Sequence, residues 1–442
     1  MKVLALAAAL AVPAMAISPI SVKGSKLFTS DGKQFFMKGI AYQLTNDDPL
    51  ANGPQCALDA KLMQSIGVNS IRVYHVDASA SHDDCMKTFA DAGIYPWIDL
   101  DTFSTYILQP TSTTPTWTQS QYNAFAAVMD AFAKYDNVAG FFVANELLNA
   151  PADSVGAPYI KAAARDMKAY RDNKGYRKFP IGYTAADIAS LRPMLQNYMA
   201  CGSDSSAALD VYGLNAYEWC GNVDFQTSGY AALQQNASQY NIPIFFSETG
   251  CIKPAPRMFG DQAAILGPDM DGTWSGAIIY EWIQEANEYG IVSYGPPAAT
   301  GSNVVDGFTR AGTPTPIQPD FSNLSKQWAT LNPTGVMAND YTPSLSAPPC
   351  PAYTSGVWLV DPSAPLPTLG QAYTGAASAQ SYGSGASSPT GSATTTTTGG
   401  SAAAVSGTTT ASTTTKSGAA QTMGAELAAA AALAFMPFIA IF

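Results

Sequence analysis

Two glutamates occupy matching positions in the sequence. Glu146 follows the apolar run Phe-Phe-Val-Ala-Asn, and Glu248 follows Ile-Phe-Phe-Ser. A carboxylate that ends a buried strand lies at the edge of the fold rather than in its core. Two carboxylates that face each other across a cleft can cleave a glycosidic bond with retention, because one protonates the leaving oxygen while the other attacks the anomeric carbon. The two carboxyl groups would then lie about 5–5.5 Å apart.

Eight short runs rich in apolar residues predict the strands that would position these glutamates. Most are nearly continuous in apolar residues, as in strands covered on both faces. Helical patterns at residues 56–67, 82–93, 118–137 and 157–175 separate the earlier runs. This alternation predicts an α/β protein, a (β/α)8 TIM barrel. The expected strands are residues 34–42, 70–76, 95–101, 139–145, 178–185, 210–217, 242–248 and 275–282.

In such a barrel the carboxyl ends of the strands form the active face. Carboxylates, amides and phenols end seven of the eight expected strands, and phenol and indole rings supply faces on which sugars stack. Arg72 has two interpretations, as a structural ion-pair partner or as a cation that lowers the pKa of a carboxylate. The expected ring is Tyr42, Gln43, Arg72, Tyr74, Asp99, Asp101, Asn145, Glu146, Asn215, Tyr217, Glu248, Tyr280 and Glu281.

Other chemistries have little support. The sequence has no G-x-S-x-G, G-x-x-x-x-G-K-[ST] or H-E-x-x-H motif, and its only histidines are His75 and His82. A lone strand histidine such as His75 is more often a core residue than a ligand, so we predict no metal site and no cofactor. The net charge of -11 disfavours nucleic-acid binding.

Both ends of the chain carry targeting patterns. Residues 1–16 have one lysine, an apolar run and Ala-Met-Ala, which predicts a secretory signal peptide; a buried N-terminal helix is the alternative. Residues 370–417 are rich in Ser, Thr and Gly, which predicts a disordered, O-glycosylated stalk. Small residues at Ser417, Gly418 and Ala419, a polar spacer and a hydrophobic tail predict a GPI-anchor propeptide over 418–442; the alternative is a tail-anchored helix.

Secretion makes the cysteines informative. Six widely spaced cysteines without a C-x-x-C pair predict three disulfides, in any of about 15 connectivities, and not a zinc cluster. Asn236 and Asn323 lie in N-glycosylation sequons, whereas Asn332 does not because proline follows it.

Six ordered motifs together resemble the fungal GPI-anchored β-1,3-glucanosyltransferases, glycoside hydrolase family 72 (the Gas/Gel/Phr family). The motifs are KGIAYQ, IRVYHVD, FFVANELLN, GLNAYEWCG, FFSETGC and IIYEW followed by NEYG. The resemblance covers residues 17–350 and extends to the signal, stalk and anchor. It implies a clan A retaining barrel that cleaves β-1,3-glucan internally and transfers the new reducing end to the non-reducing end of another glucan, which elongates the cell-wall polymer.

The resemblance also assigns roles to individual residues. It implies that Glu146 is the acid/base and Glu248 the nucleophile, with Asn145 binding the sugar 2-hydroxyl. The other positions that it places along the sugar subsites are Gln43, Tyr74, Asp99, Tyr217, Tyr280 and Tyr289. It further implies the disulfides Cys56–Cys85, Cys201–Cys350 and Cys220–Cys251.

The domain organisation follows from these patterns. A barrel over residues 17–330 is followed by an extension, 331–369, which Cys350 ties back. One departure from some relatives is that only Cys350 follows Cys251, so their cysteine-rich carbohydrate-binding module is absent. We expect a monomer on the outer face of the plasma membrane or in the cell wall.

Two other functions are kept as alternatives. The first is a retaining endo-β-1,3-glucanase that uses the same two glutamates and releases its products to water. The second is a non-catalytic protein that binds wall glucan. The presence of both glutamates favours an enzyme.

Overall fold

The computed structural model describes residues 17–44, 48–102, 104–109, 112–297 and 300–375. These residues belong to one compact unit that extends to Ala377. The expected signal peptide and anchor propeptide, and the stalk from residue 376 onward, lie outside the described residues. Within the described part of the chain, no helix has both the length and the apolar character needed to cross a membrane.

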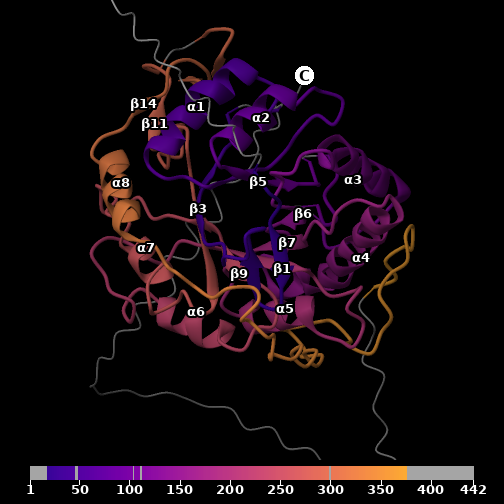
Figure 1. The fold of residues 1–442 in the computed structure, drawn as a ribbon. Helices are drawn as coiled ribbons and strands as arrows, with labels where there is room; N and C mark the ends of the chain where they lie inside the picture. Colours follow the sequence, from indigo (N-terminus) through magenta and orange to yellow (C-terminus); the bar gives the residue numbers. More distant parts are fainter. Residues whose placement is uncertain (1–16, 45–47, 103, 110–111, 298–299, 376–442) are drawn as a thin grey trace, which may run out of the picture. The chain divides into compact units, whose positions relative to one another are not determined.

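Eight parallel strands close into a barrel (Figure 1). Each strand pairs with the next along the chain, and β10 pairs with β3 to complete the circle. The predicted TIM barrel is confirmed, because every strand overlaps one of the eight expected runs. The strands are β3 (Met37–Ala41), β4 (Ser70–Val73), β5 (Tyr95–Asp99), β6 (Gly140–Asn145), β7 (Ile181–Ala186), β8 (Val211–Ala216), β9 (Ile244–Thr249) and β10 (Trp274–Ile279).

Helices surround the barrel, and the first four match the predicted ones. These are α1 (Gly53–Ser65), α2 (Asp83–Asp91), α3 (Gln119–Phe132) and α4 (Ala157–Asn173). Helix α3 starts at a reciprocal cap between Thr118 and Gln121, which satisfies otherwise unpaired backbone N–H groups. A 3₁₀ helix, η1 (Pro151–Gly156), precedes α4.

Four further helices were not predicted. They are α5 (Arg192–Ala200), α6 (Tyr230–Ala237), α7 (Gly260–Ile265) and α8 (Asp320–Thr330). None of the four starts with a side-chain cap hydrogen bond, and three of them have fewer than ten residues. Short uncapped helices depend on tertiary packing rather than on local sequence, which explains why the sequence pattern missed them.

The interior of the barrel is filled with side chains. Trp97 stacks on Phe142 with ring centroids 5.3 Å apart and contacts Phe245 at 5.1 Å. These three rings come from β5, β6 and β9, and all are completely buried. The polar residues at the strand ends therefore rest on a rigid aromatic layer.

Three small antiparallel pairs lie outside the barrel. The hairpin β1 (Ser21–Lys23) and β2 (Lys26–Phe28) precedes the first barrel strand. Strand β11 (Val292–Ser293) pairs with β14 (Thr315–Pro316), and β12 (Val304–Val305) pairs with β13 (Phe308–Thr309). The last two pairs lie in the long segment between β10 and α8.

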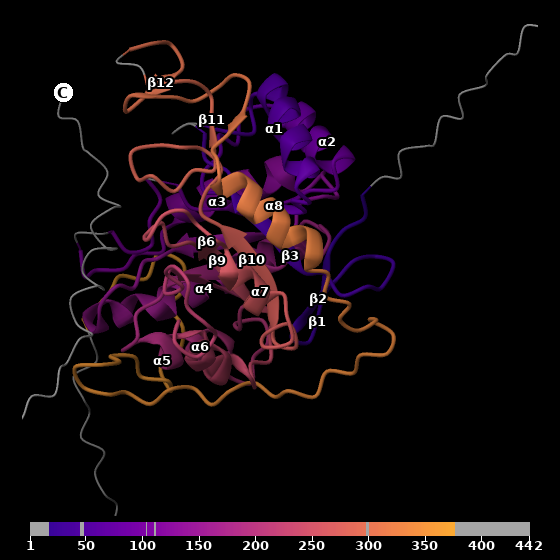
Figure 2. The same cartoon turned by 90° about the vertical axis from the view of Figure 1, so that its left-hand side faces the viewer.

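Residues 331–375, which we call the strap, follow α8 without a long helix or strand. Figure 2 shows the first part of the strap below the β1–β2 hairpin, α6 and α5. A disulfide joins Cys350 of the strap to Cys201 at the end of α5. Further on, Trp358 is fully buried against Tyr198, with ring centroids 5.5 Å apart.

The later part of the strap runs along α4 to the side of the barrel where the strands end. The Leu359 N–H donates to Ser154 Oγ in η1 at 2.9 Å, and Gly370 N–H donates to the carbonyl of Trp117 at 2.8 Å. Two further disulfides, Cys56–Cys85 and Cys220–Cys251, join neighbouring segments. The pairing in the structure is thus the one that the resemblance implies.

Candidate active site

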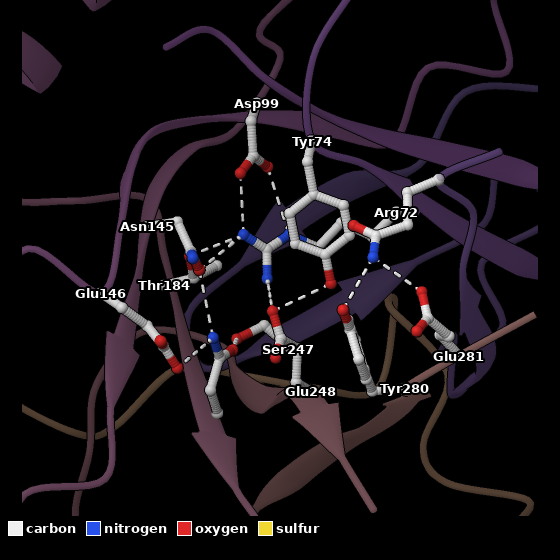
Figure 3. A network of polar contacts seen from close by, with 12 residues as sticks. Arg72, Tyr74, Asp99, Asn145, Glu146, Thr184, Ser247, Glu248, Tyr280 and Glu281 are labelled. Atoms are coloured by element: carbon white, nitrogen blue, oxygen red, sulfur yellow. Dashed lines mark hydrogen bonds and ion pairs between the residues drawn. The ribbon is translucent and has the colours of Figure 1, made fainter. Parts of the chain in front are cut away.

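Arg72 lies at the base of the site, near the end of β4, with 0% of its surface exposed. Its guanidinium donates to both oxygens of Asp99, at 3.2 and 2.8 Å, in the forked geometry that matches a carboxylate. It also donates to Glu248 Oε1 at 3.1 Å, and to Asn145 Oδ1 and Thr184 Oγ1 at 2.9 Å each. One buried cation therefore links the ends of five barrel strands (Figure 3).

Glu248 is almost completely buried (2% exposed) and is held by three donors. Besides Arg72, Tyr74 Oη donates to Oε1 at 2.9 Å and Tyr217 Oη donates to Oε2 at 2.5 Å. Both carboxylate oxygens are thus fixed by groups from β4 and from the end of β8. A positive charge and two phenols also stabilise a negative charge on this carboxylate.

The phenol rings around Glu248 form a cluster of four: Tyr74, Tyr217, Tyr280 and Tyr289. Tyr280 contacts Tyr74 and Tyr217 edge-on, with centroids 6.5 and 6.4 Å apart. Tyr289 packs against Tyr217 at 5.6 Å and against Tyr280 at 5.4 Å. Gln43 Nε2 donates to Tyr280 Oη at 2.7 Å, so five of the expected subsite positions are joined in one chain of contacts through Tyr280.

Glu146 lies one residue beyond β6, with the left-handed φ of 47°. A non-glycine residue in this region carries backbone strain, and such residues are enriched at functional sites. The turn is fixed by its N–H, which donates to the Thr184 carbonyl at 2.9 Å. The side chain accepts one hydrogen bond from Asn215 Nδ2 at 2.9 Å, and Asn215 in turn accepts from Ser247 Oγ at 2.6 Å.

Glycine at position 213 permits this last contact. A Cβ atom at Gly213 would meet Ser247 Oγ at 2.5 Å, which is closer than real Cβ atoms come to other atoms. Because Gly213 of β8 has no side chain, there is room for the Ser247 hydroxyl that orients Asn215. Asn215 also donates to Asn145 Oδ1 at 3.1 Å, so both amides and Glu146 form one connected group.

The two glutamates differ in their electrostatic surroundings. Burial raises the pKa of Glu146 to about 7, and the neighbouring charge of Glu248 acts in the same direction. The single bond from Asn215 only partly opposes this shift. Glu146 therefore holds a proton at mildly acidic pH, whereas Glu248 has a cation and two phenols directed at its oxygens.

Two buried aspartates, Asp99 and Asp101, lie near Arg72. Burial raises the pKa of Asp99 to about 6 despite the opposing charge of Arg72. Burial and then the charge of Asp99 raise the pKa of Asp101 well above its usual range. Asp101 is thus the member of this pair that keeps its proton, which leaves the charge of Asp99 for Arg72.

The structure brings the predicted ring residues of β3 to β6 and β8 to β10 to one end of the barrel. Tyr42 is the exception in orientation, because its hydroxyl donates to Asp59 on α1 at 2.8 Å, away from the ring. Arg72 contacts two carboxylates, as both of its interpretations require.

Sequence reasoning missed Thr184 and Ser247. Thr184 lies two residues before the end of β7, the one expected strand for which the ring has no member, so that gap was the signal that could have found it. Ser247 immediately precedes Glu248, and its hydroxyl donates to Asn215 within the same network. The irregular register of β9 beside β8 at this point breaks the strand alternation that would have placed it on the opposite face. His82 pairs with Asp48 at 2.7 Å on the α2 side of the barrel, and His75 is buried.

A (β/α)8 barrel with paired glutamates at the ends of β6 and β9 defines the class of glycoside-hydrolase-type barrels. A family model described as Glucanosyltransferase, glycoside hydrolase family 72, matches residues 9–309. The 1,3-beta-glucanosyltransferase gas2 of Schizosaccharomyces pombe is 40% identical over 78% of this chain and 74% of its own length. The chain belongs to this family.

Other relatives agree with that assignment. The 1,3-beta-glucanosyltransferase gel1 of Aspergillus fumigatus is 36% identical, over 80% of this chain and 74% of its own. Saccharomyces cerevisiae Gas2p, solved in complex with laminaritriose and laminaritetraose, superposes with a TM-score of 0.72 at 35% identity. That match covers 80% of this chain and 77% of Gas2p.

The pKa of Glu146 predicts how stability depends on pH. The unfolded carboxyl ionises near its ordinary pKa of 4.5, whereas the folded one does so at about 7. Between these values the unfolded state binds fewer protons, so the free energy of unfolding falls as pH rises. We expect a fall of ~2 kcal/mol, less than the full shift would give because the side chain is partly exposed.

Denaturant unfolding of the wild type and Glu146→Gln at several pH values measures this effect. The glutamine cannot ionise, so its stability relative to the wild type should increase between pH 4.5 and 7. Glu288→Gln, on an exposed side chain, makes the same chemical change as a control. If the free energy of unfolding of the wild type and of Glu146→Gln changed with pH in parallel, the raised pKa of Glu146 would be contradicted.

Proposed function

We propose that the protein is a 1,3-β-glucanosyltransferase that elongates fungal cell-wall glucan by a retaining double displacement. The observation that carries the proposal is the contrast between its two glutamates. Glu146 keeps a proton because desolvation disfavours its charge and only one amide donates to it, and Glu248 is held by Arg72, Tyr74 and Tyr217. An acid and a nucleophile in one ring are what this chemistry needs.

The first half-reaction uses both glutamates at once. Glu146 donates its proton to the glycosidic oxygen while Glu248 attacks the anomeric carbon. The bond to the leaving sugar breaks, and a covalent glycosyl-enzyme forms. Tyr74 and Tyr217 orient the two carboxylate oxygens, so that attack begins from a fixed position.

In the second half-reaction Glu146 acts as a base. It removes the proton from the hydroxyl of an acceptor glucan, whose oxygen attacks the anomeric carbon and releases Glu248. Two inversions restore the β configuration, and the product is a longer chain. Hydrolysis differs only in that water takes the place of the acceptor.

Sugar-binding roles are proposed for the residues around the glutamates. Asn145, fixed by Arg72 and Thr184, is positioned to contact the 2-hydroxyl next to Glu248. Solved structures of yeast Gas2p with laminari-oligosaccharides support a β-1,3-glucan ligand. The remaining proposed contacts are Gln43, Tyr74, Asp99, Tyr217, Tyr280 and Tyr289.

Product size distinguishes transfer from hydrolysis. The secreted form, truncated before residue 370, is incubated with a reduced β-1,3-glucan oligosaccharide, and the products are sized by mass spectrometry. Products longer than the starting oligosaccharide are expected, because a glucan acceptor intercepts the glycosyl-enzyme. Only shorter products would identify a hydrolase, and no change from folded protein would favour a binding protein.

Azide assigns the two glutamates separately. With an activated aryl β-glucan oligosaccharide, Glu248→Ala and Glu146→Ala should each lose at least about 10³-fold in transfer rate. Azide should rescue Glu248→Ala by direct displacement and give an α-glycosyl azide. In Glu146→Ala it should intercept the covalent intermediate and give a β-glycosyl azide. The anomeric coupling constant in the NMR spectrum distinguishes the products, and the opposite pattern would exchange the two roles.

We also propose that the mature chain starts at Ile17 and is held at the cell surface as a monomer by a GPI lipid near Ser417 to Ala419. The sequence patterns at both ends support this location. The proposed glycosylation sites differ in setting: Asn236 is exposed on α6, whereas Asn323 Nδ2 donates to the Arg257 carbonyl at 2.9 Å.

Enzymatic release tests the anchor. Phosphatidylinositol-specific phospholipase C should release the native protein from intact protoplasts into the medium, since it cleaves the lipid part of the anchor. A variant in which Ser417, Gly418 and Ala419 are replaced by large residues should not reach the surface in a form that the enzyme releases. Retention of the wild type after treatment would contradict GPI anchoring.

A further inference from the structure

A second polar group surrounds the end of β10. In Figure 3, Tyr280 and Glu281 lie on the opposite side of the site from Asn145 and Glu146. The members of this group come from three separate segments of the chain. The group, which we call the β10 cluster, comprises Gln43, Glu281, Glu285, Asn287 and Arg310.

Glu281 is fully buried (0% exposed) and is bound by neutral amides. Its Oε2 accepts from Gln43 Nε2 and its Oε1 accepts from Asn287 Nδ2, both at 2.7 Å. The cation of the cluster, Arg310, instead pairs with Glu285 at 2.5 Å. Asn287 also donates to Glu285 at 2.9 Å, so the two carboxyl groups share one amide.

The cluster has two carboxyl groups and one guanidinium. A buried carboxylate without a paired cation is strongly disfavoured, and Arg310 is already committed to Glu285. Burial and then the charge of Glu285 raise the pKa of Glu281 well above its usual range. Glu281 is therefore a neutral acid that donates its proton to Glu285.

This arrangement determines what Gln43 can offer to a ligand. Both hydrogens of its amide are used, one by Glu281 Oε2 and one by Tyr280 Oη, each at 2.7 Å. Gln43 therefore faces a sugar only with its carbonyl oxygen, which is an acceptor for a hydroxyl group. Tyr280 accepts from Gln43 and packs against Tyr74 and Tyr217, which both bind Glu248.

We propose that Glu281 is a positioning residue for the sugar next to Glu248. Its neutral carboxyl group fixes which way the Gln43 amide faces, and the Gln43 amide in turn fixes the Tyr280 hydroxyl. The inference rests on the proposed function, because Gln43 and Tyr280 act on a substrate only if the site binds glucan. No contact between Glu281 and the substrate is required.

A double-mutant cycle between Glu281 and Gln43 tests this inference. In Glu281→Gln, an NH2 group takes the place of the hydroxyl that donates to Glu285, and a single acceptor oxygen remains. Gln43 and Asn287 then compete for that oxygen, so the Gln43 amide is no longer held in one orientation. We expect kcat/KM for the oligosaccharide donor to fall about 10- to 100-fold. When Gln43→Ala is already present, adding Glu281→Gln should cost less than about threefold, because the residue through which it acts is gone.

The controls separate positioning from folding and from a failure of the proposed function. Glu288→Gln, on an exposed side chain of the same segment, should retain wild-type kcat/KM. If Glu281→Gln does not fold, Asn287→Ala removes the other amide bond to Glu281 and should show the same dependence on Gln43. A wild type without turnover would refute the function. Full activity of Glu281→Gln, or losses that multiply in the double variant, would overturn the positioning role.

Discussion

The ion pair between Arg72 and its carboxylates is the constraint on which the site depends. A fully buried guanidinium must be paired, and Asp99 and Glu248 supply the two negative charges. Its remaining bonds reach Asn145 and Thr184, so one side chain joins strands that are far apart in sequence. The barrel must therefore close correctly before Arg72 is satisfied, and once closed it holds Glu248 in a fixed orientation.

The same polar ring contains three kinds of carboxyl group. Glu248 accepts hydrogen bonds from one guanidinium and two phenols, and Glu146 accepts one from an amide. Glu281 is hydrogen-bonded to Glu285 and is the neutral member of that pair. All three side chains are at least partly buried, so it is their hydrogen-bond partners that set them apart. This division accounts for how one ring of similar residues can hold the proposed acid, the proposed nucleophile and the proposed neutral support.

Much of the barrel could be read from the sequence because strand order and the active face follow from the alternation of elements. That rule identified Glu146 and Glu248 without knowledge of any contact. It could not reveal that Arg310 pairs with Glu285 and not with Glu281, since this depends on a loop distant in sequence. It also could not reveal Tyr42 turning to α1, because the backbone period does not fix the side-chain partner at a strand end.

The attachment points of the strap determine how a pulling force passes from the end of residues 331–375 into the barrel. The strap starts on the hairpin side of the barrel and reaches the face that bears the glutamates. There the Gly370 N–H donates to the carbonyl of Trp117, just before α3. Tension applied beyond this point is borne first by the contacts of the strap with α4 and by Trp358. At Cys350 the load passes through a covalent bond to Cys201 at the end of α5, so residues 331–349 carry little of it. The contacts between the first part of the strap and the β1–β2 hairpin are thus shielded from pulling on the chain.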